Sequence, residues 1–212
     1  DLTIGGALLG GGFSVVTGAA TADAGIADNV LATSGSVTVL ANNNIENVTV
    51  RTGNATLINS QDLTDTSTVG SISLTSTLGS VGTGVGTPVT VQTGEPTGAS
   101  ANRNLEGSLA LSALTATEDI YVTSPSDVFV TLVQAGDIVD LRATAIEERN
   151  DAAAAADGGA DIVGTTLNLV ATDGGIGALG QIEILSGTLT ATSTAGTDGN
   201  ISLKDVDEAA DL

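Results

Sequence analysis

The chain has 212 residues and a formal net charge of −20, because 25 acidic residues face only 5 basic ones. Binding to nucleic acid or to anionic lipid needs a cationic surface, so this balance argues against both. Cysteine and histidine are absent from the sequence. The chain therefore has no disulfide framework and no thiolate chemistry. It also has no imidazole group that could act as a base or bind a metal ion.

Hydrophobic residues make up 41% of the chain and aromatic residues only 1%. The apolar content indicates an ordered protein, and the shortage of large rings favours thin stacked layers over a thick core. The sequence contains no methionine, even at position 1. We therefore expect a processed product or a portion of a longer, exported protein. No apolar run reaches the length of a membrane span.

The N-terminal part of the chain contains short runs in which apolar and polar residues alternate. Such runs occur at 2–4, 13–16, 37–39 and 48–50. A period of two is typical of β-strands with one buried face. Asn42-Asn43-Asn44 separates two of these runs, and asparagines favour tight turns. This region is predicted to consist of short strands joined by turns.

A motif in the middle of the chain returns near its C-terminal end. Residues 70–82 read GSISLTSTLGSVG, and residues 165–177, 95 positions later, read TTLNLVATDGGIG. Each copy is followed by a further alternating run, at 89–91 and at 182–184. The order of the strands is kept while the loops differ in length, which is typical of repeat architectures.

Two stretches interrupt the pattern of strands. Residues 92–109 are polar and lack alternation, so we expect an excursion from the stack. The second excursion, 143–160, contains the only helical signal. Residues 144–147 have the spacing of a capping box, and an alanine run follows at 152–156. These features predict a short surface helix at about 145–156.

The spacing of the strands is compatible with a β-sandwich or with a parallel β-helix. The kept strand order and the lack of hairpin turns between paired runs favour the β-helix. We therefore expect one all-β domain over 1–212, a right-handed parallel β-helix (β-solenoid) with one short inserted surface helix. Its internal repeat divides it roughly into 1–126 and 127–212, with about 20–25 residues in each coil.

The C-terminal segments LNLVATDGGIGALGQIEI (167–184) and GTLTATSTAGTDGNISL (187–203), followed by a final Asp-Leu, resemble a known family. They are similar to the repeats of filamentous-haemagglutinin-like large exoproteins. The resemblance covers most of the chain, strongly in 70–91, 111–130 and 164–212 and weakly in 13–60. This resemblance implies a secreted bacterial surface protein that folds as a right-handed parallel β-helix and acts as an adhesin or structural fibre. The family supplies no catalytic residues to transfer to this chain.

Aspartates in Gly-rich turns are the candidate metal ligands. Asp157, Asp161 and Asp173 resemble half of a calcium-binding nonapeptide repeat, and Ca²⁺ prefers carboxylate oxygens. The spacing is not repeated as in a ladder of such sites, so ordinary Asp-Gly turns are the favoured interpretation. The residue types that usually form a nucleophile and a general base are missing, so no enzyme activity, catalytic residue or organic cofactor is expected.

The two ends of the chain carry similar apolar residues. The candidate interface residues are Leu2, Ile4, Ile201, Leu203 and Leu212. An open end of a solenoid presents unpaired backbone groups, so these ends could pair with one another. We expect a structural component of an extracellular bacterial fibre or surface appendage that stacks head-to-tail with itself. The alternative is an adhesin stalk or carbohydrate-binding repeat that contacts flanking repeats of one giant secreted chain.

Overall fold

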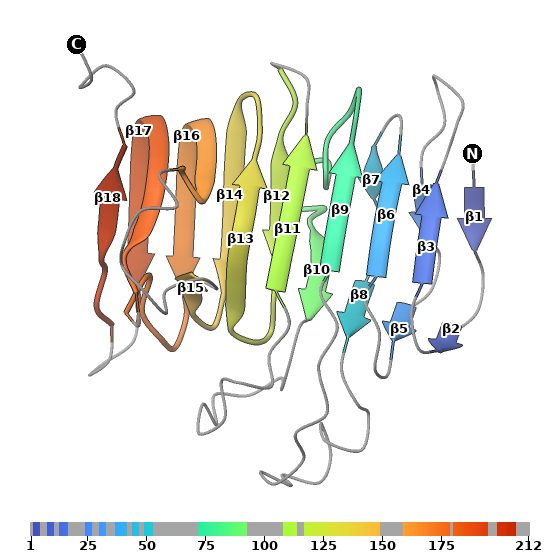
Figure 1. The fold of residues 1–212 in the computed structure, drawn as a ribbon, viewed down its shortest axis with the longest axis horizontal. Helices are drawn as coiled ribbons and strands as arrows, with labels where there is room; N and C mark the ends of the chain where they lie inside the picture. Colours follow the sequence, from blue (N-terminus) through green and yellow to red (C-terminus); the bar gives the residue numbers. More distant parts are fainter. Residues whose placement is uncertain are drawn as a thin grey trace, which may run out of the picture.

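The structure is a computed structural model of the 212-residue chain. It describes residues 2–4, 8–10, 13–16, 24–26, 30–32, 37–41, 44–46, 49–52, 72–92, 108–113, 117–148, 159–178, 180–194 and 199–206. These residues form an all-β structure whose strands follow one another along the longest axis, from β1 at one end to β18 at the other (Figure 1).

Eighteen short strands account for the regular structure of the described residues. They are β1 (Leu2–Ile4), β2 (Leu8–Gly10), β3 (Phe13–Val16), β4 (Ala24–Ile26), β5 (Val30–Ala32), β6 (Val37–Ala41), β7 (Ile45–Glu46), β8 (Thr49–Thr52), β9 (Ile72–Ser76), β10 (Val89–Gln92), β11 (Ser108–Ala113), β12 (Ile120–Thr123), β13 (Val128–Gln134), β14 (Ile138–Ala143), β15 (Ile146–Glu148), β16 (Ile162–Ala171), β17 (Ile182–Ser193) and β18 (Leu203–Asp205). All of the strand pairs among them are parallel. An antiparallel sandwich is therefore not the fold of these residues.

From β1 to β16, consecutive strands in the chain do not pair, whereas β16 pairs with β17 and β17 with β18. Register partners range from 18 positions apart, for Val128 and Ile146, to 41 positions apart, for Thr49 and Thr90. One series of neighbours runs β2, β5, β8, β10, β12, β14 and β16, and a second runs β3, β6, β9, β11 and β13. A third series, β1, β4 and β7, continues through bridges from Ile45 to Val81 and from Val81 to Ile120. We call a set of successive strands or bridge residues, one from each series, a rung.

Rungs differ in length, and the longer ones contain stretches outside the described residues. Leu2 pairs with Ala24 and Leu167 pairs with Leu189, in both cases 22 positions apart. By contrast, Ile45 and its bridge partner Val81 are 36 positions apart. The interval between those two contains residues 53–71, for which no structure is described. Register is therefore maintained across unequal intervals.

The core consists of the inward side chains of successive rungs. Strand β9 alternates buried and half-buried residues throughout, as its sequence pattern predicts. Ile72, Leu74, Leu167 and Leu169 have no exposed surface. Because each rung covers the one before it, aliphatic side chains of similar size lie directly above one another, and the aromatic residues are not needed to fill the interior.

The helix predicted at about 145–156 is wrong at its start. Ile146–Glu148 is the strand β15, and residues 149–158 lie outside the described residues. Ile146 pairs with Val128 on one side, forms a bridge with Ile176 on the other, and is fully buried. This long-range burial outweighs the local capping-box signal, because helix propensity is a weak preference that tertiary contacts override.

The remaining excursions are only partly described. Gln92 ends β10 and Ser108 begins β11, so most of the stretch expected at 92–109 lies outside the described residues. The other stretch, 143–160, contributes β15 to the sheet. Among the described residues, no helix has the length and apolar character needed to cross a membrane.

Candidate functional site

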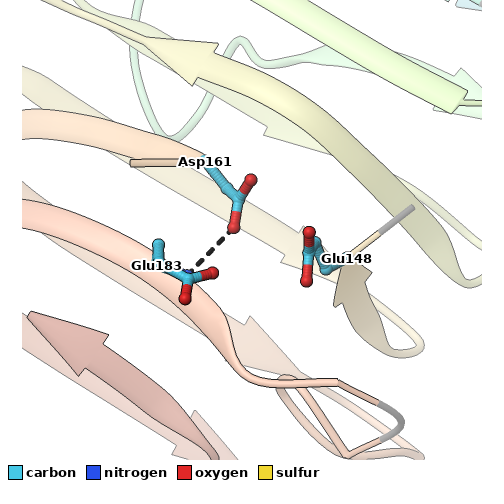
Figure 2. A group of neighbouring side chains, drawn as sticks. All are labelled: Glu148, Asp161 and Glu183. Atoms are coloured by element: carbon cyan, nitrogen blue, oxygen red, sulfur yellow. Dashed lines mark hydrogen bonds between the residues drawn. The ribbon is translucent and has the colours of Figure 1, made fainter. Parts of the chain in front are cut away.

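Three carboxylates converge on one side of the stack near its C-terminal end. Glu148 is the last residue of β15, Asp161 immediately precedes β16, and Glu183 is the second residue of β17 (Figure 2). One oxygen from each side chain lies within 4.8 Å of the others. We call these three residues the carboxylate cluster.

The stacking of rungs is what brings the cluster together. Asp161 and Glu183 are 22 positions apart, the same interval that separates Leu167 from its partner Leu189. The backbone N–H of Asp161 donates to the carbonyl oxygen of Glu183 at 2.8 Å. The backbone N–H of Glu183 donates in turn to Oδ2 of Asp161 at 2.9 Å, which Figure 2 shows as a dashed line. Once the register of 22 positions is known, adding it to Asp161 identifies Glu183.

The cluster combines a buried and a more accessible carboxylate. Asp161 is only 3% exposed, whereas Glu148 and Glu183 are half-buried. One rung further along, Lys204 of β18 pairs with Glu183 and forms an ion pair with it, with 3.2 Å between Nζ and Oε1. Part of the negative charge is thus compensated by the protein itself.

The oxygen ligands of the carboxylate cluster are of the kind that a hard divalent cation prefers. Ca²⁺ takes six to eight oxygen ligands, and the cluster offers carboxylate oxygens from three side chains. The alternative role of the cluster is structural. The hydrogen bond from the Glu183 amide to Asp161 and the ion pair between Lys204 and Glu183 both connect adjacent strands. Glu148 and Glu183 are the two members that the sequence interpretation missed.

The structure places the sequence-predicted calcium candidates apart. Asp161 belongs to the cluster, but Asp173 is exposed in the turn that follows the other end of β16. The backbone N–H of Asp173 donates to the carbonyl oxygen of Thr144 at 3.1 Å. Asp157 lies outside the described residues.

An open groove of about 310 Å³ runs across three rungs. Its lining residues are Ala135, Gly136, Val163, Gly164, Thr165, Leu185, Ser186 and Gly187. None of these side chains ionises in the ordinary pH range. The groove therefore offers no acid–base pair, and the carboxylate cluster does not line it.

The last rung at the C-terminal end leaves apolar core positions open. We define the end face by its inward positions Leu189, Ala191, Ile201, Leu203 and Asp205, which pair with the preceding rung. Leu189 is 41% exposed and Ile201 is 45% exposed. Their partners one rung earlier, Leu167 and Ile176, have no exposed surface.

Strand edges lie open at both ends of the stack. Within the described residues, β18 pairs only with β17, and the second half of β17 pairs only with β16. At the other end, the backbones of β1, β2 and β3 pair only with β4, β5 and β6 in the described part of the chain. Of the predicted interface residues, Leu2 and Ile4 lie in β1, Ile201 and Leu203 lie in the end face, and Leu212 is outside the described residues.

Comparison with known proteins found no family model, no curated protein and no solved structure that matches this chain.

Proposed function

We propose that the chain is a structural, non-catalytic segment of an extracellular bacterial fibre or surface appendage. In this proposal it folds as a right-handed parallel β-helix and joins further copies head-to-tail through its two ends. The observation that carries the proposal is the open end face, where Leu189 and Ile201 are exposed although their partners one rung earlier are fully buried.

Three features support a β-helix. Register partners are one rung apart in sequence, the pairs are parallel, and consecutive strands from β1 to β16 do not pair with each other. A chain that visits each series in turn and returns one strand spacing further along must wind around an axis. Connections between parallel strands of one sheet are almost always right-handed, which supports the proposed handedness.

The direction of the strands supports head-to-tail joining. The strand pairs are parallel, so a second copy that continued the stack in the same direction would meet β17 and β18 with its β1, β2 and β3 in parallel orientation. Such a contact joins two different surfaces and does not close on itself. Repetition of a contact of this kind produces a filament.

The composition supports an extracellular location. A strongly acidic surface fits an extracellular protein, and the absence of cysteine is compatible with export. The resemblance to filamentous-haemagglutinin-like exoproteins agrees with this location. The same open ends would also fit flanking repeats of one longer chain, in which case the joint would form within a polypeptide.

The test is the assembly state of the purified chain over a range of concentrations, followed by sedimentation velocity and negative-stain electron microscopy. The wild type is expected to form filaments, and Leu189→Asp is expected to prevent them by placing a charge in the joint. Val85→Asp is the matched control, because Val85 is 57% exposed in the loop before β10, away from both ends. Both substitutions add the same charge.

Each outcome has a clear meaning. Filaments in the wild type and in Val85→Asp, but not in Leu189→Asp, support joining through the end face. Filaments that persist in Leu189→Asp show that another surface joins the copies. A monodisperse wild-type monomer at the highest concentration overturns trans joining and directs attention to flanking repeats of the same chain.

A further inference from the structure

The last rung carries a charge at a core position. Ile162 pairs with Ile184, and Ile184 pairs with Asp205. Partners in a parallel ladder project their side chains to the same face of the sheet, and Ile162 and Ile184 both belong to the core. The side chain of Asp205 is therefore on the inward face of β18, and it is exposed, with no described strand on the other edge of β18.

A following rung would bury this side chain. Ile184 is only 2% exposed beneath β18, so any strand that pairs with the free edge of β18 would cover Asp205 in the same way. Transfer of an ionised carboxylate into an apolar interior is strongly unfavourable unless a cation accompanies it. Inward-pointing charges on edge strands are one means by which natural sheets prevent edge-to-edge pairing.

The surroundings of Asp205 supply no compensating cation. β18 packs on β17, and the charged residues described on these two strands besides Asp205 are Glu183 and Lys204. Both occupy the alternate positions that face outward, where they form their ion pair with each other. On the inward face, the β17 residues beside β18 are Ile182 and Ile184.

The side chains of the first three strands of a second copy would not supply a cation either. Strands β1, β2 and β3 contain no lysine or arginine, and the first basic residue of the chain is Arg51. The other inward positions of the last rung remain apolar at Leu189, Ile201 and Leu203. The end face therefore combines an adhesive apolar surface with one uncompensated charge.

We propose that Asp205 acts as a stop charge in the end face: it sets the concentration at which a second copy of this chain can stack on β17 and β18. This inference rests on the proposed head-to-tail function. Its partner is the β1–β3 end of another copy, because that end offers parallel strands of the same series. Neutralising the carboxylate removes the barrier and leaves the apolar contacts in place.

The experiment compares wild type, Asp205→Asn and Asp205→Leu at neutral pH by sedimentation velocity over a dilution series. Asp173→Asn is the control, since Asp173 is exposed outside the end face and the substitution removes the same charge. We expect both Asp205 variants to lower the critical concentration for assembly at least about tenfold, given the cost of burying an unpaired carboxylate. The control should assemble like the wild type.

The outcomes separate this inference from the function on which it rests. Filaments that form at the same concentration in wild type and in both Asp205 variants overturn the stop charge but leave head-to-tail joining intact. Absence of assembly in every variant overturns the joint and the stop charge together. A variant that lacks residues 207–212 completes the set. If that deletion promotes assembly and Asp205→Asn does not, the chain's own C-terminal segment controls the end, and Asp205 does not.

Discussion

Gly82 and Gly177 occupy equivalent turns in the two copies of the internal repeat, 95 positions apart in the sequence. Both have positive φ, 78° and 63°, and each directly follows a bridge residue of the ladder, Val81 or Ile176. A Cβ at Gly82 would clash with the carbonyl oxygen of Tyr121, and one at Gly177 with that of Ser202. The sequence repeat is therefore also a repeat of backbone geometry.

Replacing either glycine is expected to destabilise the fold. Gly82→Ala should lower the free energy of unfolding by about 1–3 kcal/mol or more, because a strained φ and a backbone clash act together. Gly86→Ala is the control, since nothing lies within 4 Å of its added Cβ and its φ is not in the left-handed region. Urea denaturation measures both. Equal stability of the two variants would contradict the turn geometry.

Leu167 and Leu189 are register partners in adjacent rungs, but only Leu167 is fully buried. Leu167→Ala should cost about 2–5 kcal/mol of unfolding free energy, the usual range for a buried leucine that leaves a cavity. Leu189→Ala should cost much less in the monomer, because this side chain is 41% exposed already. Chemical denaturation at low protein concentration provides the comparison. Similar losses for the two variants would mean that the end face is covered in the monomer.

Tyr121 is the single tyrosine of the chain, so its ionisation can be followed by ultraviolet absorbance. Partial burial raises the pKa of Tyr121 above its ordinary 10.0, and the negative charge of Asp119 raises it further. The Tyr121 hydroxyl donates to Oδ2 of Asp119 at 3.2 Å. The titration midpoint is expected above 10.0 in the folded protein and lower in Asp119→Asn.

The same shift predicts a loss of stability in alkali. A group whose pKa is raised on folding stabilises the fold fully below its unfolded pKa, and this contribution disappears as pH rises through the folded pKa. The free energy of unfolding should therefore fall above about pH 10. Tyr121→Phe removes the titrating hydroxyl and should weaken this dependence. An unchanged alkaline profile in Tyr121→Phe would contradict the assignment.

Asp161 is predicted to stabilise the junction between β16 and β17. Asp161→Ala should lower the free energy of unfolding by about 1–3 kcal/mol, because the Glu183 amide loses its side-chain acceptor. Asp161→Asn keeps an acceptor oxygen and reduces the negative charge beside Glu148 and Glu183, so its loss should be smaller. Thermal or urea denaturation measures both, and a larger loss in Asp161→Asn than in Asp161→Ala would exclude this role.

Local periodicity predicts the strands because each buried face is encoded every second residue. The strands β9 and β16 contain the alternating pairs Ile72/Leu74 and Leu167/Leu169 that mark the repeat in the sequence. The residues around Ile146 mislead because their helix signals are local, whereas their burial depends on partners in other rungs. A single sequence contains propensities but does not display such long-range pairing.

The carboxylate cluster is difficult to predict for a related reason. Asp161 and Asp173 are near each other in sequence, but β16 lies between them and carries them to its opposite ends. Glu148 and Glu183 come from the neighbouring strands β15 and β17. Their proximity to Asp161 follows from the rung length, which can be read only once the register is known.

The strands keep their register although the rungs differ in the number of residues they contain. Val81 joins the ladder 36 positions after Ile45 and 39 positions before Ile120, whereas Leu167 and Leu189 are 22 positions apart. Extra chain between strands therefore does not alter the order in which strands pair. Foreign peptides introduced between β8 and β9 or between β10 and β11 would be displayed at axial intervals set by the strand spacing of about 4.8 Å. The fold is thus expected to serve as a scaffold that presents inserted peptides at regular intervals without redesign of the core.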